Sequence, residues 1–542
     1  MLRDGERADI VFLNGKVVTV DASDRIAEAV AVRDGKIVRV GSNSKVKELV
    51  REGTKVIDLT GKTLLPGFID SHTHLVDAAL SLRYLVDGRT PPNKSISDIL
   101  EKIKERSKET SKGEWIIVQG SMFWDRKLAE KRYPNKEELD EAAPDHPVVV
   151  WASAHVSIVN SKALKVAGIT KDTPDPPGGK IEKDETGEPT GVLRECFALL
   201  PLPSYAHEQI KETVKMGAQK WWVQQGITTV HCFCGSYAMR IYQELLEEDE
   251  LPLRIHLVVY TEDPRIGLES LINLGICAVF GNEKLKLGGL KIFVDGAFMG
   301  LSAATYEPYV GMPNYCGLLQ LTPKELTEIA IKANREGIRL CIHAIGDKAQ
   351  DMALDAIEEA LRAVPKRDHR HRIEHLGNVL TSKERIKRAK RLGVIPVPTV
   401  EWIHAYGDFI EEFLGPERAK QSFPIKTLFD EGLRPPGCSD TLGTEPLSIN
   451  PFFSIWCAVT RKTFAGNKLI PEEGISVMDG IRMYTINGAY AGFEENVKGS
   501  IEPGKLADMI VISDDILTVP ADKIKDIRVD MTMIDGKIIY QK

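Results

Sequence analysis

Several side chains suited to metal binding or proton transfer recur at the ends of apolar segments. They are His72, His74, Lys291, His343, His375 and Asp440. Residues i and i+2 of a strand share a face, so both imidazoles of His72-Thr73-His74 can reach one ion. Imidazoles and carboxylates are ligands that Zn²⁺ and related ions take. One histidine alone is more often a packed, hydrogen-bonded side chain. Four imidazoles and a carboxylate at the same end of several strands predict a metal site.

Apolar strands that alternate with amphipathic helices must position these groups. The sequence predicts eight strands, over residues 63–74, 226–233, 254–261, 289–296, 338–346, 371–377, 394–400 and 433–440. Helices are expected between most of them, for instance over 324–336 and 347–363. Eight such units indicate an α/β fold, a closed (β/α)8 barrel of the TIM type. The active site of such a barrel lies at the C-terminal ends of its strands.

The spacing of the histidines predicts where the barrel is interrupted. One βα unit takes about 30 residues, which is the separation of His343 from His375. A much longer stretch separates His74 from His231, where a single unit would suffice. We therefore expect a large insertion after barrel strand one, over about 85–205. Substrate binding is a natural role for it, and a structural or oligomerising role is nearly as well supported.

Both chain ends show the alternation typical of β-strands. Asn14-Gly15, Asp34-Gly35 and Asp535-Gly536 predict hairpins, because tight hairpin turns need positive φ. Each end is too small to form a stable sheet alone, so the two are expected to pair, with two unrelated β appendages as the alternative. The predicted organisation is a small β-sandwich domain of residues 1–66 and 493–542, and a barrel domain of residues 67–492 that carries the insertion.

The composition excludes several classes of protein. A chain of 542 residues with 43% hydrophobic and 27% charged residues is typical of globular proteins, not of disordered, collagen-like or coiled-coil chains. The net charge of −7 predicts no bulk attraction to nucleic acid or to an anionic membrane. No signal peptide or membrane span is expected. Eight scattered cysteines are interpreted as reduced thiols, which favours a cytoplasmic location.

The chain resembles the amidohydrolase superfamily, and within it amidohydrolase family 3, whose members include deformylases of N-substituted formamides. The motifs together are highly specific and span nearly the whole chain. They are PGFIDSHTHL (66–75), VVVWASAHVSIVNSKAL (148–164), LKIFVDGAFMGLSAA (290–304), LCIHAIGD (340–347), RIEHLG (372–377), CSDTLG (438–443), AVTR (458–461) and YTINGAYAGFEE (484–495).

The resemblance implies a ligand set for one or two divalent ions per chain, with zinc expected. His72, His74 and Asp440 would hold the more buried ion, and His343 and His375 the second. The implied reaction is attack by a metal-activated hydroxide on a carbonyl that the metal polarises. Asp440 would act as general acid/base, taking the water proton and delivering it to the leaving nitrogen.

Lys291 matches a lysine that CO₂ carboxylates in many superfamily members, where it bridges two metals. An ammonium repels cations, whereas a carbamate is an anionic oxygen ligand, so the bridging role requires the modification. The alternatives are an unmodified Lys291 beside a single metal, or a lysine paired with Asp295.

Five further residues are weaker candidates for substrate contacts: His155, Glu195, His231, Arg461 and Trp124. His155 matches a family histidine, although a structural hydrogen bond is equally consistent. His231 closes predicted strand two and is expected near the barrel mouth. Arg461 could bind an anionic substrate group or brace the barrel, and Trp124 suggests an apolar pocket in the insertion.

The leading functional hypothesis is a metal-dependent hydrolase that cleaves a non-peptide C–N bond, the amide of an N-acyl or N-formyl compound. The alternatives are a cyclic-amide hydrolase or an aminohydrolase (deaminase), and a non-catalytic binding or assembly protein. By analogy with the family, Lys291 favours amide cleavage over deamination, and the retention of all six matched ligands disfavours a non-catalytic protein. The expected partner is a small-molecule substrate, with a homodimer expected on frequency alone.

Overall fold

The computed structural model describes residues 7–152, 156–176, 179–261, 263–277, 279–442 and 445–542. The chain divides into two compact units. Unit 1 comprises Met1–His74, Lys215–Asp440 and Leu447–Lys542, and unit 2 comprises Leu75–Val214 and Thr441–Pro446. The domain boundaries given by the sequence stay a prediction.

The centre of unit 1 is a nearly closed parallel sheet of seven strands. In sheet order they are β20 (Ile395–Val397), β19 (Arg372–Glu374), β18 (Leu340–His343), β17 (Leu285–Phe293), β16 (Arg254–Val259), β15 (Ile227–Cys234) and β8 (Phe68–Thr73). All neighbouring strands run parallel. Strands β8, β15 and β16 are buried at every residue, as is typical of a sheet covered on both faces. The predicted α/β barrel architecture is therefore confirmed as a nearly closed parallel sheet of seven strands.

The eighth predicted strand, over residues 433–440, is not a strand in the structure. Its two adjacent prolines have no N–H to donate to a sheet ladder. The segment nevertheless lies beside β8. Ser71 N donates to Gly437 O at 3.0 Å, and Asp440 N donates to His72 O at 2.7 Å. Asp440 thus reaches the same edge of the barrel as His72 without a regular ladder.

Residues 63–74, which the sequence predicts as one strand, are two strands in different sheets. β7 (Thr63–Pro66) belongs to a terminal sheet and β8 to the barrel. Between them lies Gly67, where a Cβ would come within 2.4 Å of Thr228 Cγ2. Only a glycine lets the chain pass this close to its neighbour.

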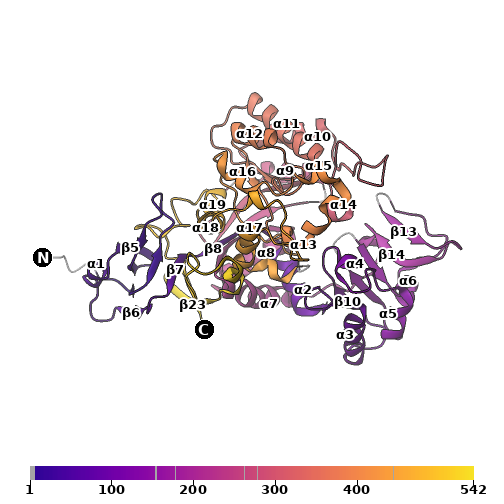
Figure 1. Ribbon diagram of the computed structural model, residues 1–542, viewed down its shortest axis with the longest axis horizontal. Helices are drawn as coiled ribbons and strands as arrows, with labels where there is room; N and C mark the ends of the chain where they lie inside the picture. The colour runs from indigo at the N-terminus through magenta and orange to yellow at the C-terminus, as the bar shows by residue number, and fades with distance from the viewer. Residues whose placement is uncertain (1–6, 153–155, 177–178, 262, 278, 443–444) are drawn as a thin grey trace. The chain divides into compact units, whose positions relative to one another are not determined.

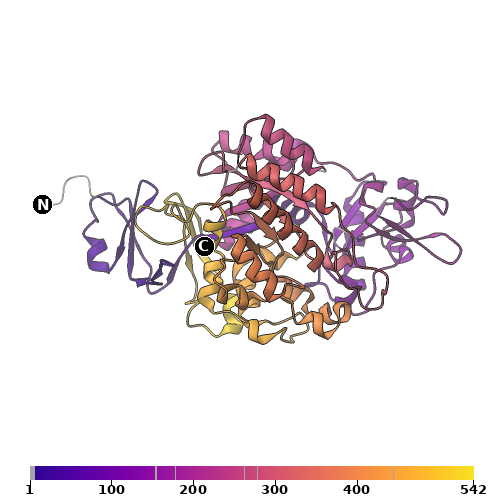
Figure 2. The same cartoon turned by 90° about the horizontal axis from the view of Figure 1, so that it is seen from above.

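Amphipathic helices pack in a layer on the outside of the barrel. α10 (Pro323–Arg335), α11 (Asp347–Ala363) and α12 (Lys383–Leu392) lie side by side (Figure 1). Figure 2 shows the same helices from above. α10 begins with a capping box between Thr322 and Glu325 and has proline in its first turn, both typical helix-start signals. The predicted helices over 324–336 and 347–363 are confirmed to within one residue. Other long helices of this unit are α8 (Ser236–Glu247), α9 (Pro264–Asn273) and α17 (Pro451–Thr460).

Strands from both chain ends form two further sheets in unit 1. One sheet has the order β5 (Lys36–Gly41), β4 (Ala29–Arg33), β1 (Ile10–Leu13), β6 (Lys55–Asp58). The other has the order β23 (Lys537–Gln541), β22 (Val529–Ile534), β21 (Met509–Ile512), β7, β2 (Lys16–Val18), β3 (Ile26–Ala27). β7 pairs antiparallel with β21, so the two ends of the chain share a sheet. Phe12, Val30, Met509 and Met533 lie in one hydrophobic cluster that joins both sheets.

Two of the three predicted hairpins are present. Asp34-Gly35 joins β4 to β5, and Asp535-Gly536 joins β22 to β23. The prediction at Asn14-Gly15 is wrong, because β1 and β2 lie in different sheets. β4 and β6 occupy the two edges of β1, which leaves no edge for β2.

Unit 2 is built on a six-stranded sheet. Its order is β13 (Lys180–Lys183), β14 (Pro189–Arg194), β12 (Val156–Val159), β11 (Val148–Trp151), β10 (Ile116–Gln119), β9 (Val86–Asp87). Helices α3 (Ile96–Glu109) and α5 (Lys136–Ala142) contribute Ile99, Ile103 and Leu139 to its hydrophobic core. The boundaries of the insertion over 85–205 stay a prediction.

None of the helices in the described ranges has the length and apolar character needed to cross a bilayer. All eight cysteines are free thiols, and six of them are buried.

Candidate functional site

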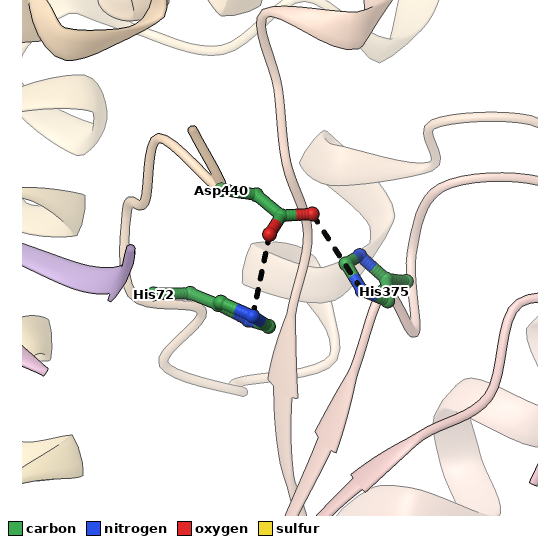
Figure 3. A group of neighbouring side chains, drawn as sticks. All are labelled: His72, His375 and Asp440. Carbon is green, nitrogen blue, oxygen red and sulfur yellow. Dashed lines mark ion pairs between the residues drawn. The ribbon is translucent and has the colours of Figure 1, made fainter. Parts of the chain in front are cut away.

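Asp440 lies between His72 and His375, as Figure 3 shows. Asp440 Oδ1 is 3.3 Å from His72 Nε2, and Asp440 Oδ2 is 3.8 Å from His375 Nε2. One ligand atom from each of these three residues lies within 4.8 Å of the other two. His74 joins the group, because its Nε2 is 3.4 Å from Asp440 Oδ1. The structure therefore brings four of the six predicted ligands together.

Lys291 and His343 adjoin this group. Lys291 Nζ is 3.4 Å from His72 Nε2 and lies over the ring of Phe233. The ring centroid of His343 is 4.7 Å from that of His375. His343 Nε2 lies 3.2 Å from Gly296 O. The ligand atom of His375 is thus grouped with those of His72 and Asp440, whereas the resemblance pairs His375 with His343.

The backbone at two of these residues adopts an uncommon conformation. His375 has φ 71° and Asp440 has φ 43°, in the left-handed region that residues other than glycine seldom occupy. Such conformations concentrate at functional sites, where the surrounding structure holds them. β19 ends at Glu374, so this turn is what brings the His375 ring toward Asp440.

Burial controls the protonation of the site. It lowers the pKa of His72 well below its usual value, and the neighbouring Lys291 lowers it further. Burial also lowers the pKa of His375, with a second contribution from His343. The pKa of Lys291 is lowered by burial, although Glu374 and Asp440 oppose the shift. The two imidazoles are therefore neutral near pH 7, which is the form that binds a metal.

The residues that hold the site in place were missed by the sequence reasoning. Asp70 accepts hydrogen bonds from Ser439 N at 2.8 Å and Ser439 Oγ at 2.6 Å, and so fixes the residue before Asp440. Burial raises the pKa of Asp70 to about 6, although its hydrogen bonds to Ser439 oppose the shift. Asp70 is two residues before His72 on the same strand, so the alternation that selected His72 and His74 could also have selected it.

Aromatic rings and a second carboxylate hold the two histidines. The His72 ring stacks on Phe233 with centroids 3.7 Å apart, and the His375 ring stacks on Trp402 at 5.1 Å. His72 Nδ1 is 2.7 Å from Glu374 Oε2. The sequence does contain a sign of Glu374: it forms a charged pair with Arg372, and the two lie at alternate positions of a buried strand.

His231 lies inside the barrel and not at its mouth, which corrects the expected position. It is three residues before the end of β15 and is fully buried. Its ring stacks on His256 with centroids 4.6 Å apart, and its Nδ1 lies 2.9 Å from Arg372 Nη1. Burial lowers the pKa of His231 well below its usual value, and His256 adds to the shift.

The other weak candidates that the structure describes each have surroundings of their own within their unit. Arg461 follows α17, is 1% exposed, and donates from Nε to Leu469 O at 2.9 Å. Trp124 is fully buried in the hydrophobic core of unit 2, and Glu195 is an exposed residue of that unit just after β14. His155 lies outside the described residues.

A hollow of about 230 Å³ includes Lys291. It lies at the C-terminal ends of β16 and β17, where Thr261, Arg265, Phe293 and Gln320 also line it. Ligand pockets for small molecules have volumes of about 300–1,000 Å³ and combine apolar walls with a few polar groups. The hollow is smaller than this range, so its size fits only a small molecule.

The residues of the cluster fit a divalent ion. Two buried neutral imidazoles and one carboxylate present nitrogen and oxygen atoms to a common point. This donor set suits Zn²⁺ and similar transition metals, and not the all-oxygen preference of Ca²⁺ or Mg²⁺.

Comparison with known proteins decides the family. Residues 55–540 match the amidohydrolase family. The chain belongs to that family. It is 32% identical to N-substituted formamide deformylase of Arthrobacter pascens over 98% of this chain and 98% of that protein. It is also 32% identical to the protein LONG AFTER FAR-RED 3 of Arabidopsis thaliana, over 98% of this chain and 92% of that protein.

A solved structure supports the assignment of this amidohydrolase. An uncharacterized metal-dependent hydrolase from Pyrococcus horikoshii superposes with a TM-score of 0.74 and 27% identity, over 95% of this chain and 99% of that one. The amidohydrolase is therefore a metal-dependent enzyme that hydrolyses carbon–nitrogen bonds.

Proposed function

We propose that this amidohydrolase cleaves the amide bond of an N-acyl or N-formyl amine. The observation that carries the proposal is the convergence of His72, His375 and Asp440 at the C-terminal edge of the barrel, where such enzymes bind substrate. The similarity to a deformylase along 98% of the chain supports an amide as the bond that is broken.

The proposed metal ligands are His72, His375 and Asp440, with His74 beside them. Lys291 and His343 are the candidates for a second ion. A divalent ion held there, with zinc the best match to the donors, supplies Lewis acidity and lowers the pKa of a water that binds it. Burial of Lys291 supports its carboxylation, because the neutral amine is the form that reacts with CO₂.

Asp440 is the proposed general acid/base. Its carboxylate takes the proton of the attacking water and passes it to the nitrogen that leaves. Hydrogen bonds from Ser439 to Asp70 fix the backbone next to Asp440, so the carboxylate keeps its direction while the proton moves. The hollow at Lys291 is the proposed position of the substrate, with Phe293 as an apolar wall.

Amine release from a panel of substrates tests the proposal. The panel contains N-formyl, N-acetyl and longer N-acyl amines, a cyclic amide and an aminopurine, each with zinc-loaded protein and with chelator. Chelator-sensitive turnover of one acyclic amide is the expected result. Turnover of only the cyclic amide or only the aminopurine would replace the proposal with ring opening or deamination. If protein that is shown to hold its metal turns over no compound of the panel, the amide substrate class is rejected.

A further inference from the structure

We propose that Glu374 is a positioning residue that holds the His72 proton on Nδ1 and so keeps the Nε2 lone pair directed into the site. The inference rests on the proposed metal site at His72. Arg372 and His231 hold Glu374 in this position below the cluster.

The contact between Glu374 and His72 is short and fully enclosed. Glu374 Oε2 lies 2.7 Å from His72 Nδ1, and neither side chain is more than 1% exposed. Because the pair is enclosed, bulk water does not compete with Glu374 for His72 Nδ1. His72 Nε2, on the other side of the ring, lies 3.3 Å from Asp440 Oδ1 and 3.4 Å from Lys291 Nζ. The two ring nitrogens thus have separate partners, one below the site and one within it.

Arg372 makes Glu374 an acceptor. Its Nε donates to Oε1 and its Nη2 to Oε2, both at 2.8 Å. Burial opposes the charge of Arg372, yet its pKa is raised overall because Glu374 stabilises the guanidinium. A carboxylate that accepts two such bonds has no proton to give to Nδ1, so Nδ1 carries the hydrogen and Nε2 the lone pair.

His231 and a backbone carbonyl complete the network. Arg372 Nη1 lies 2.9 Å from His231 Nδ1, and Arg372 Nη2 donates to Ser71 O at 2.7 Å. Every nitrogen of the buried guanidinium therefore has a partner. A buried group whose hydrogen bonds are all made is held rigidly, so Arg372 keeps Glu374 in a single arrangement. His231 contributes to the site from within the barrel, through Arg372.

A lone pair on Nε2 and the facing carboxylate oxygen repel each other, and a cation that binds both atoms removes this repulsion. The tautomer is in this way connected with metal binding. If Nε2 carried the proton, it would donate to Asp440 and could not bind an ion. A carboxylate behind a metal-binding histidine typically contributes a factor of about 10–100 in metal affinity.

Zinc affinity of the metal-free protein tests the role of Glu374. Apo protein is titrated with Zn²⁺ in competition with a chromophoric chelator, for wild type, Glu374→Gln and Glu494→Gln. The last variant is the matched control, since Glu494 Oε2 lies 2.7 Å from His256 Nε2 in an equally buried pair, which meets the network through the stacking of His256 on His231 and not at a proposed ligand. A thermal scan of each apo protein reports whether it is folded.

We expect Glu374→Gln to bind Zn²⁺ about 10–100-fold more weakly and to change the visible spectrum of the Co²⁺-loaded protein, because glutamine can donate to Nδ1 and shift the proton to Nε2. Glu494→Gln is expected to keep wild-type affinity and spectrum. If Glu374→Gln does not fold, Glu374→Asp preserves the charge opposite Arg372, and its shorter reach is expected to weaken zinc binding.

Wild-type affinity in a folded Glu374 variant, or an equal loss in Glu494→Gln, would overturn the positioning role. Failure of the wild-type protein itself to bind zinc or cobalt would instead reject the metal site on which the inference rests.

Discussion

One oxygen of Asp440 lies close to two histidines, His72 in β8 and His74 just after it. Oδ1 lies 3.3 Å from His72 Nε2 and 3.4 Å from His74 Nε2, while Oδ2 faces His375. The carboxylate is therefore the centre of the ligand cluster. Its two proposed roles, as ligand and as proton carrier, can be separated by mutation.

Asp440→Asn separates them. The amide keeps an oxygen that can bind a metal but cannot accept and return a proton. We expect the variant to retain much of its metal and to lose at least about 10²-fold in kcat, the lower range for one acid/base group. Steady-state rates together with metal analysis check this. Near-normal turnover would contradict the proton-transfer role.

Lys291→Ala tests the bridging role. A carboxylated lysine contributes anionic oxygen to both ions, so its removal is expected to lower bound metal to one ion per chain or none. Elemental analysis of wild type and variant, purified and loaded in the same way, measures the change. Unchanged stoichiometry would mean that Lys291 does not bridge two metals.

The barrel was predictable because buried parallel strands leave continuous apolar segments in the sequence, separated by amphipathic helices. The structure departs from the predicted strands where backbone constraints outweigh that pattern. The two prolines before Gly437 prevent a ladder in the last segment, and Gly67 divides the first. At Asn14-Gly15 the turn residues are typical of a hairpin, but the pairing of β1 with β4 and β6 determines the topology.

The predicted ligands converge because they lie in or just after segments whose C-terminal ends meet at one edge of the barrel. The alternation of side chains along a strand does not predict where a side chain points once the strand has ended. The positive φ of His375 turns its ring to Asp440, and no pattern in the sequence signals that turn. His231 was expected at the mouth because it lies near the end of a predicted strand, yet it packs against His256 and Arg372 inside the barrel.

A buried ion pair links the barrel to the C-terminal strands. Arg254 on β16 donates from Nε and Nη2 to the two oxygens of Asp508, and both side chains are almost fully buried. Without Asp508, the buried Arg254 keeps Asp535 as its remaining carboxylate partner, so Asp508→Ala is expected to lower the free energy of unfolding by up to about 3–5 kcal/mol. Urea denaturation measures it.

Lys62→Ala is the matched control for that variant. Lys62 pairs with Asp530 at 2.7 Å, but the lysine is 46% exposed. Exposed pairs contribute about 0–1 kcal/mol, so the control is expected to change little. An equal loss in the two variants would contradict the importance of burial.

His256 predicts a pH dependence of stability. Burial lowers its pKa to about 4, although Glu494 opposes the shift. The unfolded chain, with a histidine pKa near 6.5, therefore binds more protons, and stability falls as the pH drops from about 6.5 to about 4. The loss from this group is about 3 kcal/mol at 1.36 kcal/mol per pKa unit. The groups around it are His231, Glu494, Lys286 and Lys498.

Urea denaturation between pH 7 and pH 4.5 measures that slope, with His256→Gln as the comparison. The variant has no imidazole to protonate, so its free energy of unfolding is expected to fall less steeply over this range. Identical slopes for the two proteins would show that His256 does not remain neutral in the folded state.

The dependence of the hydrolysis rate on bound metal shows whether the cluster around Asp440 is a catalytic metal site. Apo protein is titrated with Zn²⁺, and amine release from an active amide is measured against the metal bound per chain. We expect no turnover without metal, a rate that rises in proportion to the metal bound, and loss of both binding and rate in His375→Ala. Full activity in metal-free protein, or a wild-type rate in a His375→Ala protein that binds no ion, would contradict a catalytic metal site at this cluster.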